Sequence, residues 1–453
     1  MPAQWTADQV LALAPDAASA KNGRGLATRQ KWISLGQQQS MIWGECQGSG
    51  KNPYQTQIDL SEPAFRCSCP SRKFPCKHGL GLFLLLAEQP GEIVETDPPA
   101  WVSEWLASRS QRSEKQAEKQ AKRQEQAADP IAQAKRAAER QRKVSAGIQE
   151  LRLWLEDRVR QGLATLPQES YQMWDTIAAR MVDAQAPGLA RQLRELGGIV
   201  HTGADWSERV LERLGRLYLL IEGFERIETL PTAVQADLRT QIGWSFNQEE
   251  VLAGQAQADL WLVVGQRTEE EERLRARRTW LYGIATHTFA LLLDFAHGHQ
   301  PFEQSLLPGT CLEAELVFYP SAYPLRALIK TRLEAVALPK SPPGIESIAE
   351  AVCPSGISEA IATYSKALAN CPWLERFPLL LKDVIPRQEE KGWLLQDQQG
   401  VVLPLSRQME ATQAWQLLAL SGGYPLSVFG EWDGTFLTVL SVWVEDSYYG
   451  FGN

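Results

Sequence analysis

Three cysteines and one histidine between residues 67 and 78 constrain this chain more than any other feature of its sequence. The stretch reads Cys-Ser-Cys-Pro-Ser-Arg-Lys-Phe-Pro-Cys-Lys-His, so one residue separates Cys67 from Cys69 and one separates Cys76 from His78. Three thiolates and an imidazole form a tetrahedral zinc set, and four protein ligands leave no open position for water or substrate. The spacing therefore predicts one structural Zn²⁺ ion bound by Cys67, Cys69, Cys76 and His78.

The spacing of the ligands also predicts their local structure. Residues i and i+2 of an extended segment point to the same side, so Cys67 and Cys69 can face one ion. Pro75 suits the first turn of a helix, where its missing N–H costs nothing. Cys76 and His78 are then expected in the turn that opens an almost wholly apolar helix over residues 79–87. The predicted finger is a small sheet plus this helix, with strands at 41–46 and 54–60.

Other roles for the cysteines are less favoured. A disulfide between Cys67 and Cys69 would close a strained ring. The remaining cysteines of the seven are scattered without pairing spacing, which fits a reducing compartment. Cys46 could be a spare thiol beside the zinc, but a buried strand residue is the favoured interpretation.

Four basic residues surround the predicted ligands: Arg66, Arg72, Lys73 and Lys77. Nearby cations lower the pKa of a thiol and so favour the thiolate that binds metal. They also give the finger a basic rim, and these four residues are the candidates for contact with nucleic acid.

The pattern Cys-x-Cys, a short spacer and Cys-x-His resembles the SWIM-type zinc finger, and the flanks resemble a bacterial family of SWIM proteins. The flanking residues are Leu13–Asp16, Trp43–Glu45 and Pro53–Tyr54, with weaker matches at Pro187–Arg191 and Arg278–Leu281. The resemblance implies binding to nucleic acid or proteins and no established enzymatic activity. It also implies a protein partner, a MoxR-type AAA ATPase or a von Willebrand A domain protein.

The whole chain, at 453 residues, is too long for one compact core. No signal peptide is expected at its start, and no apolar run is long enough to cross a membrane, so a cytoplasmic protein is expected. The predicted fold class is α+β with several domains: the zinc finger, a helical domain and a mainly antiparallel C-terminal region. The predicted boundaries are 1–92 for the finger, 93–145 for a linker and charged arm, 146–256 for the helical domain and 257–453 for the C-terminal region, which is one domain or two divided near 340.

Charge is distributed unevenly along the chain. The net charge is −8, but residues 1–143 carry about +5 and the rest about −13, counted from the same sequence. Residues 109–143 hold much of the positive charge and have no apolar stripe to bury. They are expected to form an exposed helix or a disordered arm, interrupted near Pro130.

The C-terminal region changes from helical to strand-like periodicity near residue 257. Residues 268–278 are strongly charged and are expected to form an exposed connection between two strands. Asp294, His297 and His299 could in principle hold a second metal, although solvated turn chemistry is the favoured interpretation. Gly50-Lys51 ends like a phosphate-binding loop but lacks its first glycine and the following Ser or Thr, so no nucleotide site is predicted.

Two functions follow from these features, and neither is enzymatic. The first is a zinc-binding protein that binds DNA or RNA through the basic finger and arm. The alternative is a protein-interaction scaffold in which zinc only stabilises a small domain. The basic rim favours the first function, and the acidic, Trp-rich remainder of the chain favours the second.

Overall fold

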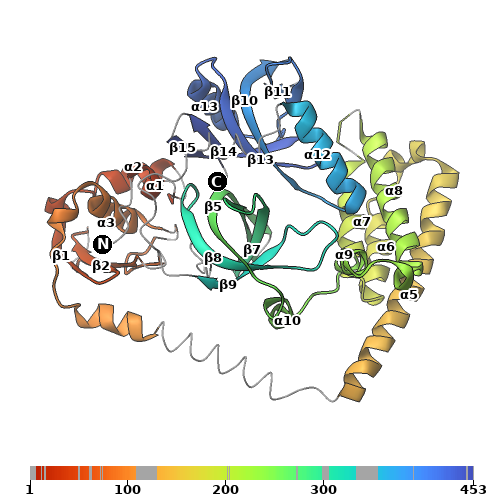
Figure 1. Cartoon of the computed structure of the whole chain (residues 1–453), viewed down its shortest axis with the longest axis horizontal. Helices are drawn as coiled ribbons and strands as arrows, with labels where there is room; N and C mark the ends of the chain where they lie inside the picture. Colours follow the sequence, from red (N-terminus) through yellow and green to blue (C-terminus); the bar gives the residue numbers. More distant parts are fainter. Residues whose placement is uncertain are drawn as a thin grey trace.

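The computed structural model describes most of the chain. The described residues are 7–11, 13–14, 17–48, 52–60, 64–71, 73, 75–108, 130–200, 202–203, 205–271, 274–297, 302, 306–332, 356–390, 392–444 and 447–451. Figure 1 shows an N-terminal module, a helical bundle at the opposite end and two β-sheets between them. The predicted α+β fold class with several domains is confirmed.

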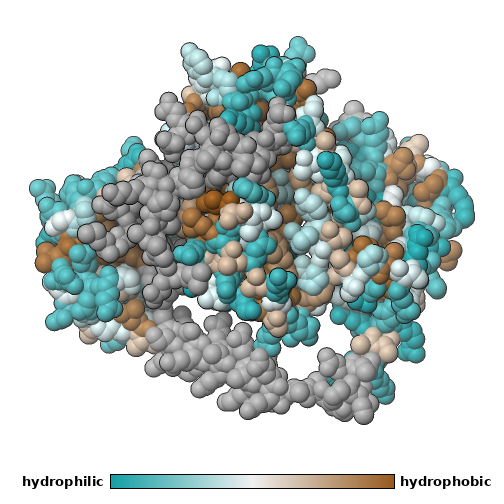
Figure 2. Space-filling view, in the orientation of Figure 1, coloured by the Kyte–Doolittle hydropathy of each residue, from teal (hydrophilic) through white to brown (hydrophobic). Residues whose placement is uncertain are grey.

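The N-terminal module is a four-stranded antiparallel sheet in the order β1-β2-β3-β4, with helix α3 packed against it. Its buried core combines the apolar side of α3 with side chains such as Trp32, Ile42 and Ile58. Figure 2 shows mainly hydrophilic residues on the visible described surface of this module. The elements are α1 (Ala7–Leu11), α2 (Ala17–Arg24), β1 (Trp32–Gln38), β2 (Met41–Cys46), β3 (Tyr54–Asp59), β4 (Ala64–Cys67) and α3 (Lys77–Glu88).

Residues 93–108, which lie within the predicted linker and arm at 93–145, pack on this module. Thr96 donates its backbone N–H to the carbonyl of Gln37, at 3.1 Å. Residues 100–108 form a helix whose Val102 and Trp105 are buried against Met41 and Trp43 of β2. The burial of this apolar face explains why the module extends beyond the predicted boundary at residue 92.

The helical bundle begins inside the predicted arm. Helix α5 starts at Pro130, a proline suited to a first helical turn, and runs without a break across the predicted boundary at 145/146. Arg140 lies over the ring of Trp244 and donates to the carbonyl of Gly243, so this part of the arm is docked on the bundle. The helices are α5 (Pro130–Gln161), α6 (Gln172–Asp183), α7 (Pro187–Ile199), α8 (Trp206–Glu225), α9 (Thr232–Ile242) and α10 (Gln248–Leu252).

The first central sheet has five antiparallel strands in the order β7-β6-β5-β8-β9. The expectation of an exposed connection at 268–278 is wrong, because β5 and β6 continue as a paired ladder from Arg267↔Arg278 to Glu271↔Leu274. Ion pairs support this extension: Arg278 pairs with Glu269 at 2.8 Å, and Arg277 pairs with Asp294 of β7 at 2.9 Å. The strands are β5 (Gln257–Glu271), β6 (Leu274–Gly283), β7 (Phe289–His297), β8 (Cys311–Phe318) and β9 (Ala327–Arg332).

The second central sheet has six antiparallel strands in the order β12-β11-β10-β13-β14-β15. Its helices α12 (Ile357–Asn370) and α13 (Ala411–Ser421) both contact the central strand β10. The strands are β10 (Phe377–Glu389), β11 (Gly392–Gln396), β12 (Val402–Pro404), β13 (Leu426–Trp432), β14 (Leu437–Val444) and β15 (Ser447–Gly450).

Strand β10 is not predicted from the sequence. Its Pro378 and Pro386 argue against a central strand, since proline cannot donate to a ladder. The structure nevertheless pairs β10 with both β11 and β13, with an irregularity between Leu381 and Val384. Asp383 has a φ of 56° at this point. The strand therefore bends where its pairing with β13 ends and its pairing with β11 begins.

The two central sheets share one buried core. Leu262, Val264, Trp280 and Tyr282 of the five-stranded sheet pack with Leu380, Phe429, Leu440 and Trp443 of the six-stranded sheet. Gly265 lies at this contact, and a Cβ atom there would be 2.9 Å from Cβ of Leu440. The sheets are therefore held together by close packing, and also by the ion pair from Arg278 to Glu431.

Two of the predictions fall on residues that the structure does not describe: the part of the arm at 109–129 and the division near residue 340. Within the described ranges, the helices are all too short or too polar to span a bilayer.

Candidate metal centre

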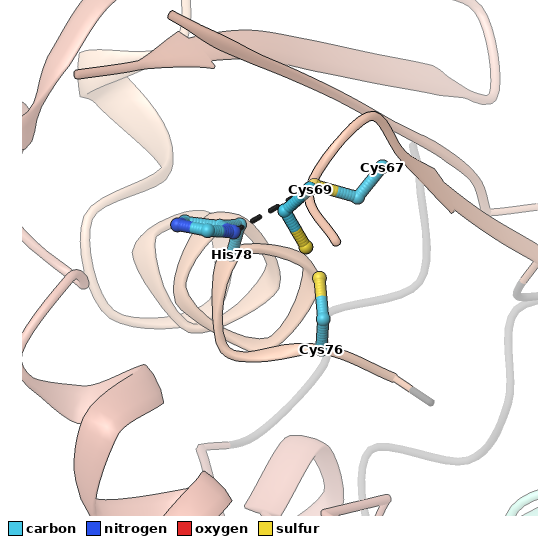
Figure 3. Close-up of side chains that lie close together, drawn as sticks. All are labelled: Cys67, Cys69, Cys76 and His78. Atoms are coloured by element: carbon cyan, nitrogen blue, oxygen red, sulfur yellow. Dashed lines mark hydrogen bonds between the residues drawn. The ribbon is translucent and has the colours of Figure 1, made fainter. Parts of the chain in front are cut away.

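The four predicted ligands come from the end of strand β4 and the start of helix α3. Cys67 is the last residue of β4, and Cys69 follows two residues later. Cys76 precedes the first turn of α3 as its N-cap, and His78 is the second residue of that helix. Figure 3 shows the four side chains gathered between the strand end and the helix start.

The donor atoms are close enough to share one metal ion. All four lie within 4.8 Å of one another, and Sγ of Cys67 is 3.7 Å from Nδ1 of His78. Zn–S bonds of about 2.3 Å in a tetrahedron would place sulfur atoms roughly 3.8 Å apart. The donor set and its spacing therefore fit zinc, with only a small contraction of the cluster.

The surroundings of the cluster hold its side chains in place. The hydroxyl of Thr56 lies 3.2 Å from Sγ of Cys67, and the ring of Tyr54 lies 4.8 Å from the ring of His78. Gly79 passes close to Phe65, whose ring would be 3.0 Å from an added Cβ. Such outer contacts orient the ligands of a metal site. The sequence marked Tyr54 only as a residue of the resemblance and did not mark Thr56, because β3 reaches the cluster only through tertiary structure.

The close contacts within the cluster shift the pKa values of its thiols and of its imidazole. Hydrogen bonds from Cys67 and Cys76 lower the pKa of the Cys69 thiol, whereas the hydrogen bond to Cys69 raises the pKa of the Cys67 thiol. Burial lowers the pKa of His78, but bonding to Cys69 and Cys76 outweighs burial and raises this pKa to about 9. A divalent cation would displace the protons of the cysteine thiols and satisfy all four donors at once.

The predicted basic rim is solvent-exposed where the structure describes it. Arg66 on β4, Lys73 in the ligand loop and Lys77 on α3 all have exposed side chains. Arg72 lies outside the described residues. Arg66 and Lys77 have no carboxylate partner among the described residues, so their charges are available to an anionic ligand.

The other candidate ligands that the structure describes do not join a metal site. Asp294 forms an ion pair with Arg277, at 2.9 Å, and His299 lies outside the described residues. Cys46 is a core residue of β2 with 1% exposure. Its thiol does not belong to the cluster of four metal-binding side chains. Among the described residues, the cluster at 67–78 is the single group of metal-binding side chains that was found.

Comparison with known protein families supports both the finger and the bundle. Residues 54–87 match the SWIM zinc finger, and residues 139–242 match the SWIM-associated four-helix bundle domain. The first match covers β3, β4 and α3 with all four ligands, and the second runs from within α5 to the end of α9. No match was found among curated proteins or among solved structures. The predicted resemblance is confirmed: the chain carries a SWIM zinc finger, with a zinc-binding site, followed by a SWIM-associated four-helix bundle.

Proposed function

We propose that this protein is a non-enzymatic nucleic-acid-binding protein whose finger holds one structural zinc ion and binds DNA through its basic rim. The contacts are assigned to Arg66, Lys73 and Lys77, together with Arg72. The observation that carries the proposal is the exposure of Arg66, Lys73 and Lys77 around the metal cluster. The free thiols of Cys46, Cys311 and Cys371 fit a reducing compartment, so the proposed location is the cytoplasm.

The donor set supports a structural role for the zinc. Three cysteines and one histidine complete a tetrahedron without an open position, whereas catalytic zinc keeps one position for water or substrate. Cys76 and His78 are also buried, with 6% and 4% exposure. The metal would therefore tie β4 to α3 and fix the positions of the neighbouring cations.

The cations suit contact with phosphates. Arg66 and Lys77 have no carboxylate to displace among the described residues, so binding would not break an existing ion pair. Each phosphate neutralised releases counterions, which makes binding weaker as salt increases. The proposal therefore predicts a salt-dependent interaction that requires the folded finger.

The test is a titration of the zinc-loaded full chain with labelled double-stranded DNA, single-stranded DNA and RNA at several salt concentrations. Double-stranded DNA should bind, and the double variant Arg66→Ala/Lys77→Ala should bind about tenfold more weakly with a shallower salt slope. Arg387→Ala removes one exposed charge from β10 and serves as the control. Absence of binding at low salt, or equal loss in the control, would reject the proposal.

A second candidate function is a protein-interaction scaffold. Trp415 on α13 is 55% exposed and meets Trp393 of β11 edge-on, with ring centroids 5.3 Å apart. Exposed tryptophans are typical anchors of protein interfaces. The partner suggested by the resemblance is a MoxR-type AAA ATPase or a von Willebrand A domain protein.

The scaffold function can be tested separately with a purified MoxR-type AAA ATPase and a purified von Willebrand A domain protein from the same source. Binding that weakens in Trp415→Ala, but not in Arg66→Ala/Lys77→Ala, would support the scaffold. Absence of binding to both proteins would leave the tryptophan pair without the proposed role.

A further inference from the structure

A pocket of about 220 Å³ lies where the helical bundle meets the chain segment that leads into β10. Helices α7, α8 and α9 line one side, and Trp373 and Glu375 close the other. It is far from the finger in the sequence and shares no residue with the metal centre. The pocket therefore needs an explanation separate from zinc binding.

The walls of the pocket are fixed to each other. Trp373 packs into the core of the bundle and donates its indole N–H to the carbonyl of Arg216, at 3.1 Å. Across the junction, Arg191 of α7 pairs with Glu375, at 2.8 Å. These contacts give the pocket a shape that does not depend on a ligand.

The carboxylates of the pocket already have arginine partners. Glu195 and Glu375 both pair with Arg191, at 2.6 Å and 2.8 Å. Arg216 is in turn paired with Glu212, at 2.6 Å. After these pairs are formed, two lining guanidinium groups remain without a carboxylate among the described residues, those of Arg209 and Arg213.

Arg209 and Arg213 lie four residues apart on α8, so they occupy the same face of the helix. Both line the pocket, and both are half-buried. Arg209 donates to the carbonyl and the hydroxyl of Thr202, which are neutral oxygens, at 3.3 Å and 3.2 Å. Arg213 has no hydrogen-bond or ion-pair partner within the described part of the chain. Two guanidinium groups without a carboxylate partner therefore face one small pocket, and the seven charged side chains named here, four arginines and three glutamates, sum to +1.

The chemistry of the ligand follows from these groups. Guanidinium groups match phosphate and carboxylate in geometry, and a phosphate monoester carries about −1.5 to −2 charges at pH 7. A phosphate monoester offers three acceptor oxygens to the two guanidinium groups, whereas a carboxylate offers two. Half-buried Ile199 offers apolar surface to an organic group, and the buried Leu196 and Leu217 lie behind it.

We propose that this pocket binds an organic phosphate monoester, with Arg209 and Arg213 holding the phosphate and the apolar wall holding the organic group. The ligand is either a small phosphorylated molecule or a phosphorylated side chain of a protein, because both present the same chemistry. The proposal is independent of nucleic-acid binding by the finger, since the two sites share no residue.

The experiment is calorimetric titration of the full chain at constant ionic strength with phenyl phosphate, a serine phosphopeptide and benzoate. Phenyl phosphate or the phosphopeptide should bind with a one-to-one stoichiometry. Tighter binding of phenyl phosphate assigns the site to small molecules, and tighter binding of the phosphopeptide assigns it to protein side chains. Absence of binding by both phosphates, or equally tight binding of benzoate, would overturn the proposal.

Variants locate the binding in the pocket. Arg213→Ala should weaken phosphate binding about tenfold or more, because one charge-assisted contact is lost. Arg213→Lys keeps the positive charge without the planar guanidinium group, so it should lose less phosphate affinity than Arg213→Ala. Arg226→Ala removes an exposed arginine just beyond α8 and should have no effect. Unchanged binding in Arg213→Ala, or the same loss in Arg226→Ala, would place the phosphate elsewhere and reject the pocket.

Discussion

Arg278 and Glu431, which lie in different sheets, form a buried ion pair at the core between them. Nε of Arg278 is 2.9 Å from Oε1 of Glu431, and the two side chains are 9% and 3% exposed. The same carboxylate oxygen accepts the indole N–H of Trp280, at 2.8 Å. Arg376, next to the pocket segment, approaches the other oxygen at 3.5 Å. Glu431 is thus the polar centre of the contact between β6, β13 and the start of β10.

Removing this carboxylate is expected to destabilise the paired sheets strongly. Glu431→Ala would leave the buried guanidinium and indole groups with fewer acceptors, and breaking a buried pair from one side costs about 3–5 kcal/mol. The measurement is the thermal or urea unfolding transition of the full chain, followed by tryptophan fluorescence. Glu270→Ala, at an exposed position of β5, is the control and should change stability by less than about 0.5 kcal/mol. Equal effects of the two substitutions would contradict this role for Glu431.

The pH dependence of stability should include a contribution from Glu269. Its carboxylate is bonded by both terminal nitrogens of Arg278, each at 2.8 Å, and this bonding lowers the pKa of Glu269 to about 2. A carboxyl group with a depressed pKa in the folded state stabilises the fold above the pKa of the unfolded chain, about 4.3. The contribution is lost as the pH falls from about 4.3 towards 2.

Glu269→Gln tests this contribution directly. The substitution should lower the unfolding midpoint temperature at pH 7. It should also make this midpoint fall less between pH 4.5 and 2.5, about the range over which the Glu269 carboxyl titrates. Circular dichroism melting curves at a series of pH values provide the measurement. The interpretation fails if wild type and variant lose stability in parallel over that interval.

Gly188 should tolerate no side chain, because α7 begins against the end of α9. A Cβ atom at Gly188 would lie 2.2 Å from the carbonyl oxygen of Gln241. Gly188→Ala is therefore expected to destabilise the bundle by about 1–3 kcal/mol through overpacking. Gly198 lies near the end of the same helix with no atom within 4 Å of an added Cβ, so Gly198→Ala should be neutral or stabilise by up to about 1 kcal/mol. Chemical unfolding of the two variants measures the change in the free energy of unfolding, which should be of opposite sign or clearly unequal in the two.

Loss of zinc should unfold the finger and leave the rest of the chain folded. Zinc binding contributes about 10–16 kcal/mol in finger peptides, which is comparable to or larger than the stability of a small domain. Cys76→Ser, or removal of zinc with a chelator, should make the first hundred or so residues sensitive to protease while the bundle and sheets resist.

Cys46→Ala is the matched control for the zinc ligands. Cys46 is a buried thiol on β2 of the same module but is not part of the donor cluster. Its replacement should retain one bound zinc per chain by elemental analysis. Loss of zinc in Cys46→Ala, or a protease-resistant finger in Cys76→Ser, would show that the ligand set is incorrect.

Local spacing in the sequence determined the features that depend on neighbouring residues. The ligand pairs Cys67–Cys69 and Cys76–His78 are held close by two peptide units, so chemistry and spacing alone identify the zinc site. Periodicity likewise predicts helices such as α6 and α8, because their apolar faces repeat every three or four residues.

Only the tertiary structure decided the features that join distant segments. Arg278 and Glu431 are separated by 153 residues, and the charged run around Arg278 resembles an exposed loop until Glu431 and Glu269 are placed beside it. Strand β10 contains two prolines and becomes a central strand because both neighbours pair with it. The phosphate pocket depends on Trp373 and Glu375 meeting α7 and α8. Burial and charge pairing act between segments brought together in space, which local propensity does not record.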